Sequence, residues 1–131
     1  MAGAFVLAFA SSFVFARAGQ SENVTTVVIH FSRFEPSVVT ATTGEPITLR
    51  LRNDDPIAHE WIVGIEAIHE RHRTGTEPYH DEVPTEVTIP ALQSRTTTVQ
   101  FDAPGDYVFI CHLPGHEAYG MRGVLRVLPA D

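Results

Sequence analysis

Beyond Gln20, the chain consists largely of short segments rich in Val, Ile and Thr that are separated by turns containing Pro or Gly. Residues 24–31 have the β-branched composition that fits a pleated surface. Residues 47–51 alternate apolar and polar side chains, as a half-buried strand does. Further strands are predicted at residues 37–41, 57–63, 86–89, 95–101, 106–111 and 122–128. The first turn is expected at residues 34–36, which read Phe-Glu-Pro.

Seven or eight short strands joined by such turns predict an all-β fold, a Greek-key β-sandwich. Residues 64–84 interrupt the strand pattern, because they lack a period of two and are expected to hold a short helix near residues 65–73. The span 53–86 carries nine of the sixteen acidic residues and two of the nine arginines. We interpret it as an acidic excursion over the surface of the sandwich.

The N-terminus has a different character. Residues 2–15 are almost wholly apolar, and Ala16-Arg17-Ala18 follows with small residues at alternate positions. This pattern is typical of the hydrophobic core and cleavage site of a secretory signal, and the run is shorter than the roughly 20 residues of a membrane-spanning helix. We predict a signal peptide or hydrophobic anchor at residues 1–18, followed by one domain at residues 22–131. The alternative is a frayed hydrophobic helix.

Composition narrows the classes of partner and site. The 131 residues carry a formal charge of −7, and all nine basic residues are arginine. This balance argues against nucleic acid or an anionic membrane surface as a partner, so that membrane contact is expected only through the N-terminal segment. The single cysteine excludes an intramolecular disulfide, an all-cysteine zinc site and a dicysteine copper centre.

That cysteine lies in a segment crowded with soft metal ligands. Cys111, His116 and Met121 follow one another in the pattern Cys-x4-His-x4-Met, and Met121 is the only methionine besides Met1. Thiolate, imidazole and thioether groups together suit copper better than a hard cation. One further histidine would complete a mononuclear copper site.

The strand before this loop places its cysteine. Alternation along residues 106–111 puts Tyr107, Phe109 and Cys111 on one face of the strand, so that Cys111 points inward from the end of the strand. The alternative is that Cys111 is a buried core thiol, Met121 a core filler and His116 a loop residue. The coincidence of all three at this spacing favours copper.

With these residues, the chain resembles the cupredoxins, the plastocyanin/azurin superfamily of single-domain blue copper proteins. The Cys-x4-His-x4-Met loop is most similar to that of rusticyanin and auracyanin-type members, and the resemblance spans about residues 27–128. It implies one type 1 copper ion per chain, with His59, Cys111 and His116 as equatorial ligands and Met121 as the axial ligand. It also implies a β-sandwich and outer-sphere electron transfer through the edge of His116.

Two positions depart from the usual family pattern. Glu60 replaces the Asn or Ser that commonly follows the first histidine, and His112 replaces a small hydroxyl residue after the cysteine. Groups next to ligands tune a metal site. We hypothesise that Glu60 bonds the backbone of the Cys111 loop or pairs with His112. His112 itself is expected to face solvent, in preference to serving a second copper centre.

Other aromatic residues and histidines are assigned less specific roles. Trp61 and Tyr119 are expected to pack near the copper site. The set His69, His72 and His80 is compatible with a secondary copper or zinc site, although a solvated acidic loop is the favoured interpretation.

The function predicted from these observations is electron transfer outside the cytoplasm, in the periplasm or an equivalent compartment, without enzymatic activity. Redox proteins such as a cytochrome or a terminal oxidase are the expected partners. One alternative is a copper-binding or delivery protein without a redox partner. The other, disfavoured, is a type 1 domain of an oligomeric copper oxidoreductase, since the chain has no His-x-His motif to supply further ligands.

Overall fold

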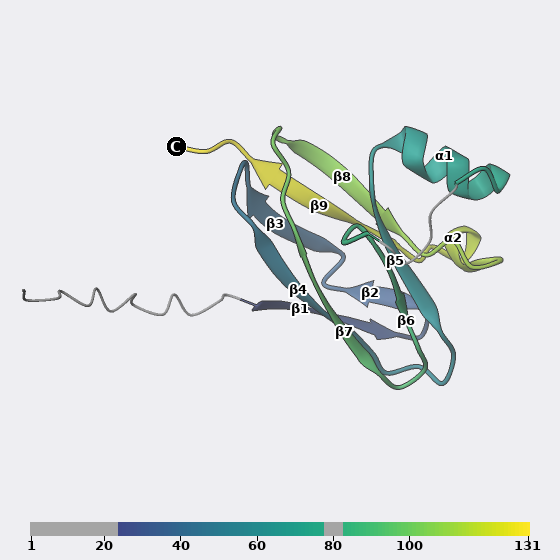
Figure 1. The fold of residues 1–131 in the computed structure, drawn as a ribbon. Helices are drawn as coiled ribbons and strands as arrows, with labels where there is room; N and C mark the ends of the chain where they lie inside the picture. Colours follow the sequence, from purple (N-terminus) through teal and green to yellow (C-terminus); the bar gives the residue numbers. More distant parts are fainter. Residues whose placement is uncertain (1–23, 78–82) are drawn as a thin grey trace, which may run out of the picture.

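The computed structural model describes residues 24–77 and 83–131, so the predicted signal or anchor segment and His80 lie outside the described residues. Two β-sheets pack face to face (Figure 1). One sheet has the order β2 (Arg33–Glu35), β1 (Val24–His30), β4 (Ile47–Asn53), β7 (Ser94–Val99). The other has the order β3 (Val38–Thr42), β9 (Arg122–Leu128), β8 (Gly105–Ile110), β5 (His59–Gly64), β6 (Glu86–Ile89). The predicted all-β sandwich is confirmed.

The alternation read from the sequence corresponds to the two faces of each strand. In β4, Leu49 and Leu51 are fully buried while the arginines between and after them are exposed. Trp61 and Phe109 are the largest fully buried side chains between the sheets. Phe34 contacts Phe109 edge-on, with ring centroids 5.2 Å apart. Burial of these apolar faces holds the two sheets together.

Two short elements were not predicted. The three-residue strand β2 occupies most of the segment expected to be a turn, and it pairs antiparallel with β1. The hairpin between them turns at Phe31 and Ser32, whose φ angles of 50° and 52° are both left-handed. The short helix α2 (His116–Tyr119) lies within the ligand loop.

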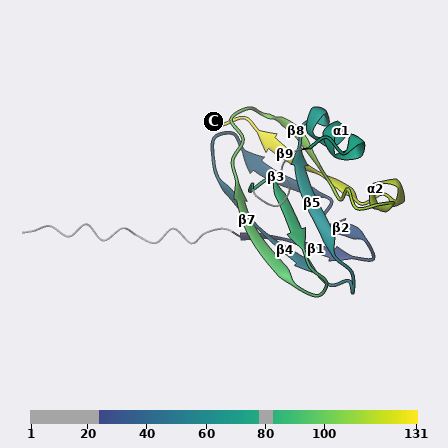
Figure 2. The same ribbon diagram turned by 45° about the vertical axis from the view of Figure 1, so that its right-hand side comes forward.

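The predicted helix in the excursion is present as α1 (Glu66–Thr74). It ends at Gly75, a left-handed residue whose N–H donates to the carbonyl oxygens at the end of the helix, as glycine allows. Helices α1 and α2 lie side by side at one end of the sandwich in both views (Figures 1 and 2). The described residues include no helix long and apolar enough to cross a membrane.

Sheet register brings distant parts of the chain to this end. Strand β8 runs antiparallel to both β5 and β9, with Ile110 opposite Ile62 on one side and Arg122 on the other. The end of β8 therefore meets the beginnings of β5 and β9. These three strand ends carry the residues predicted to bind copper.

Candidate metal centre

The four predicted ligands come together at that edge of the five-stranded sheet. His59 begins β5, Cys111 follows β8, His116 begins α2, and Met121 precedes β9. His59, Cys111 and Met121 are fully buried, whereas His116 is partly exposed. The cluster of soft donors therefore extends from the core to the surface.

The donor atoms have the spacing of ligands around one ion. The Nδ1 atom of His116 lies 3.2 Å from the Nδ1 atom of His59 and 3.2 Å from the Sγ atom of Cys111. Two ligand atoms that bind an ion at about 2.0–2.1 Å with near-tetrahedral angles are roughly 3.3 Å apart. One thiolate, two imidazoles and a weak axial thioether form the donor set of a type 1 copper site, so these residues fit that ion.

Main-chain hydrogen bonds hold the ligand loop closed. The Cys111 N–H donates to the Met121 carbonyl oxygen at 3.2 Å, and the Met121 N–H donates to the His116 carbonyl oxygen at 3.0 Å. The His116 N–H in turn donates to Leu113 O at 3.0 Å. The spacing between the three ligands is therefore fixed by the backbone itself.

Asp55, which the sequence did not single out, orients His59. The Nε2–H of His59 donates to Asp55 Oδ2 at 2.9 Å, which leaves Nδ1 as the lone-pair nitrogen that faces the other ligands. The backbone N–H groups of Phe31 and Ser32 also donate to this carboxylate, each at 2.8 Å. Burial alone raises the pKa of Asp55, but these two N–H groups and His59 bring the pKa below its ordinary value.

Asn53 places Asp55 in turn. It is buried, its side-chain oxygen accepts the Asp55 N–H at 3.0 Å, and its amide group donates to Ile57 O at 2.7 Å. The same amide group reaches the carbonyl oxygens of Ile89 and Pro90 at the end of β6. The turn at residues 53–56, which the sequence does not distinguish from an ordinary turn, therefore holds His59 in place.

The cysteine sulfur receives one main-chain donor. The Glu60 N–H points at Cys111 Sγ from 3.3 Å. Burial raises the pKa of the Cys111 thiol, and the Glu60 N–H opposes this effect. A metal ion bound at the sulfur would hold it as a thiolate. This contact runs from the Glu60 backbone to the cysteine side chain, so the proposal that Glu60 bonds the backbone of the Cys111 loop or pairs with His112 stays a hypothesis.

The prediction that His112 faces solvent is wrong. Its side chain is 6% exposed, because α1 covers it. Its Nε2–H donates to His69 Nδ1 at 2.9 Å, and the Nε2–H of His69 donates to Val108 O at 3.0 Å. Burial, followed by the neighbouring His69, lowers the pKa of His112 to about 4, so both rings are neutral near pH 7.

The interpretation of the His69 and His72 segment as a solvated loop is also wrong, since both side chains are buried. The alternative, a site in which His69 and His72 bind one ion together with His80, is not supported for the two described histidines. His69 directs its ring nitrogens at His112 and Val108, whereas His72 faces Glu86 with 3.6 Å between Nε2 and Oε2.

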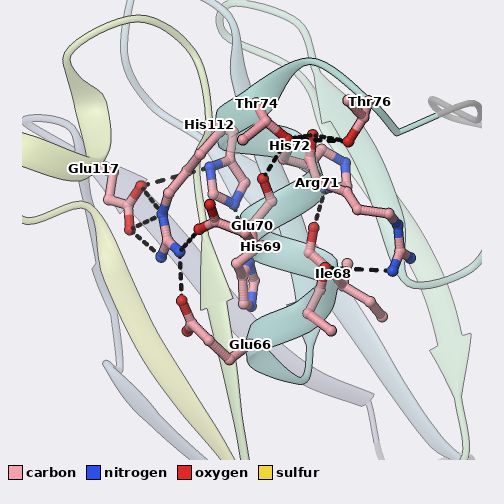
Figure 3. A network of polar contacts seen from close by, with 12 residues as sticks. Glu66, Ile68, His69, Glu70, Arg71, His72, Thr74, Thr76, His112 and Glu117 are labelled. Atoms are coloured by element: carbon pink, nitrogen blue, oxygen red, sulfur yellow. Dashed lines mark hydrogen bonds and ion pairs between the residues drawn. The ribbon is translucent and has the colours of Figure 1, made fainter.

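Ion pairs join the two helices beside His69, His72 and His112 (Figure 3). Arg73 of α1 donates to Glu117 of α2 at 2.7 Å and also contacts Glu66 and Glu70 of its own helix. Hydrogen bonds that Arg73 donates to the carboxylates of Glu117 and Glu66 hold the pKa of Arg73 above its ordinary value. The acidic excursion thus neutralises part of its charge internally and fastens α1 to the ligand loop.

Trp61 and Tyr119, the two aromatic residues expected near the copper site, differ in exposure. Trp61 is fully buried in the same core cluster as Cys111 and Met121, as expected. Tyr119 is 57% exposed and lies under the guanidinium of Arg33, 4.9 Å from its ring centroid. Tyr119 also lines a recess with His116, so it lies near the predicted copper site as expected, but at the surface.

Comparisons with known proteins agree with this geometry. The model of the family described as a cupredoxin-like domain matches residues 3–127. The copper-resistant cuproprotein CopI of Rubrivivax gelatinosus is 31% identical over 99 residues, which cover 72% of this chain and 59% of that protein. The chain thus matches less than two thirds of the length of that relative.

Solved structures share the fold. Reduced auracyanin from Roseiflexus castenholzii superposes with a TM-score of 0.67 at 24% identity, covering 85% of this chain and 100% of that one. Auracyanin A of Chloroflexus aurantiacus, described as a "blue" copper protein, has a TM-score of 0.66 at 23% identity and covers 80% and 98%. At these identities the likeness establishes the architecture of the sandwich.

Proposed function

Because the chain belongs to the cupredoxin-like domain family, which binds type 1 copper, we propose that it is an electron-transfer protein. His59, Cys111, His116 and Met121 would hold the ion, which would supply a one-electron Cu(II)/Cu(I) couple. The sandwich and the hydrogen-bonded loop keep the ligand side chains in place, so that little rearrangement accompanies a change in charge.

The observation that carries this proposal is the exposure of one ligand. His116 lines a recess together with Phe31, Ser32 and Tyr119, while the other three ligands are buried. Phe31 is 73% exposed and Tyr119 is 57% exposed. Two exposed aromatic rings beside the one accessible ligand suit the approach of a protein partner, because aromatic residues are enriched in interfaces.

The partners that we propose are redox proteins, such as a cytochrome or a terminal oxidase, in a compartment outside the cytoplasm. The apolar run at residues 2–15 supports export. The acidic span 53–86 would favour the approach of a basic partner, an effect that salt screens. Fractionation of cells that express the full chain would test the location, and a purely cytoplasmic protein would contradict it.

A second candidate function is copper tolerance without a redox partner. It is favoured by the 31% identity to a protein named copper-resistant cuproprotein CopI. In that case the four ligands would sequester copper, and the exposed recess would have no electron-transfer partner.

We propose no enzymatic role. A type 1 domain that serves a second copper centre needs the residue beside its cysteine to reach that centre. His112 is 6% exposed and bonded to His69, so its ring is directed into the protein and is not presented at the surface. Oxygen or nitrite turnover by the copper-loaded protein would contradict this proposal.

The decisive experiment measures electron exchange of the copper-loaded protein with a basic c-type cytochrome by stopped flow. Phe31→Asn removes an aromatic ring from the recess, and asparagine tolerates the left-handed backbone there. We expect the rate to fall about tenfold, corresponding to about 1.4 kcal/mol of docking energy, with an unchanged visible spectrum.

Leu128→Asn is the matched control, because Leu128 is a 46% exposed apolar residue at the opposite end of β9 and the change to asparagine adds no charge. It should leave the rate unchanged. A protein that binds copper tightly but exchanges electrons slowly and equally in all three forms would favour copper tolerance over electron transfer.

A further inference from the structure

A second cluster of metal-binding side chains lies outside the copper centre. His72, Glu77 and Glu86 bring one ring nitrogen and two carboxylate oxygens to within 4.8 Å of one another. They come from α1, from the chain just beyond the end of α1, and from the first residue of β6. Their side chains are only 2%, 6% and 8% exposed, so the cluster is part of the interior rather than a solvated acidic surface.

The orientation of His72 is that of a metal ligand. Its Nδ1 lies 2.9 Å from the carbonyl oxygen of Ile68. A carbonyl oxygen only accepts, so Nδ1 carries a proton, and in the neutral ring Nε2 then bears the lone pair. Histidines that bind metals almost always donate their other ring N–H to such an acceptor. The lone pair of His72 therefore belongs to the nitrogen that faces Glu86.

The spacing also fits coordination. Nε2 of His72 lies 3.6 Å from Oε2 of Glu86, which is longer than a good hydrogen bond. It is close to the roughly 3.3 Å that separates two ligand atoms of one zinc ion. Arg71 Nε donates to Glu77 Oε2 at 2.7 Å, and this ion pair holds the second carboxylate in place. Carboxylates with so little exposure are generally paired with cations or coordinate metals.

We propose that His72, Glu77 and Glu86 bind a divalent transition-metal ion of the Zn(II) type, separately from the copper centre. A neutral imidazole with two carboxylates suits Zn(II), whereas Mg(II) and Ca(II) take oxygen ligands and Cu(I) takes sulfur. Water completes the coordination. The ion connects α1 to β6 and so fastens the helix that covers His112. This inference stands independently of the electron-transfer proposal.

The test uses the copper-loaded full chain dialysed against Zn(II), with bound metals counted by elemental analysis. We expect one Zn(II) per chain in addition to copper, and an unchanged visible copper band. Glu86→Gln and His72→Gln should each weaken zinc binding at least about tenfold. Glu70→Gln is the matched control, because Glu70 lies on α1 with a 63% exposed side chain outside the cluster; it should bind zinc normally.

Three results would overturn the proposal. The first is the absence of zinc from the copper-loaded protein after dialysis. The second is equal zinc binding by the wild type, Glu86→Gln and His72→Gln, which would assign the zinc to adventitious surface groups. The third is tighter binding of Mg(II) than of Zn(II). If either variant fails to fold, Glu77→Gln provides the same comparison at the helix end.

Discussion

Replacing Asp55 with asparagine should weaken both the copper site and the fold. The carboxylate accepts three hydrogen bonds, from His59 and from the N–H groups of Phe31 and Ser32. An asparagine has one oxygen to accept them and turns an NH₂ group towards donors. Loss of the charge-assisted bond to His59, worth about 1.5–3 kcal/mol, dominates, so we expect Asp55→Asn to lower the free energy of unfolding by about 2 kcal/mol.

The magnitude is large enough to measure in two ways. For a domain of this size, a loss of about 2 kcal/mol corresponds to a fall of about 8 °C in the melting temperature of the copper-free protein. Copper affinity should fall about 10- to 100-fold, because the carboxylate fixes which nitrogen of His59 faces the metal. Competition with a chromogenic chelator measures the affinity, and urea unfolding measures the stability.

Asp54→Asn is the control for this experiment. Asp54 is the neighbouring residue, its side chain is 39% exposed, and it pairs only at the surface with Arg52. Surface pairs contribute little, so this variant should behave as the wild type does. If Asp55→Asn kept the copper affinity and the melting temperature of Asp54→Asn, the carboxylate would have no role in orienting His59.

Three further predictions concern stability. Burial lowers the folded-state pKa of His69, so the unfolded chain binds a proton first as pH falls through about 6.5. Urea unfolding of the copper-free protein should therefore show a loss of stability from pH 7.5 to pH 5, and His69→Gln should lessen that loss; an equal loss in the variant would contradict the assignment. Gly123→Ala places a Cβ against the ring of Phe109 and against the Ser37 carbonyl oxygen, and overpacking of this kind costs about 1–3 kcal/mol. Thermal unfolding measures that cost, and an unchanged melting temperature would show that the ring and the Ser37 backbone both yield without cost. Asp106 and Arg126 form an ion pair in which both side chains are 51% exposed. Asp106→Asn should therefore leave the melting temperature unchanged, and a clear decrease would give this surface pair a structural role.

The strands and three of the four ligands were predictable because their signals are local. Alternation in residues 47–51 reports directly on which face is buried, and Cys111, His116 and Met121 lie within one short loop. His59 lies 52 positions before Cys111 (111 − 59) and is one of seven histidines, so only the resemblance to a family identified it. Sheet register, which no local pattern encodes, brings it to the loop.

The errors have a common physical origin in tertiary packing. His112 was expected to be exposed because it is polar and lies just past a strand, but α1 packs over it. Asp55 was overlooked because Asn-Asp-Asp-Pro reads as an ordinary turn. A signal was nonetheless present, since Asp55 precedes His59 by four residues and a carboxylate near a ligand histidine commonly orients it. The three-residue β2 is too short to show any alternation.

The main-chain bonds that close the ligand loop have a consequence for redesign. The segment that holds Cys111, His116 and Met121 makes most of its backbone hydrogen bonds within itself. His59, by contrast, is held by Asp55 and Asn53, which precede it in the N-terminal half of the chain. The metal centre therefore has two independent parts. The first is the loop from Cys111 to Met121, and the second is His59 with its supporting residues Asp55 and Asn53. A transplanted loop of another length would bring its own ligand spacing and would still meet the same oriented imidazole of His59. The properties of the metal could therefore be varied while His59 and its supports stay unchanged.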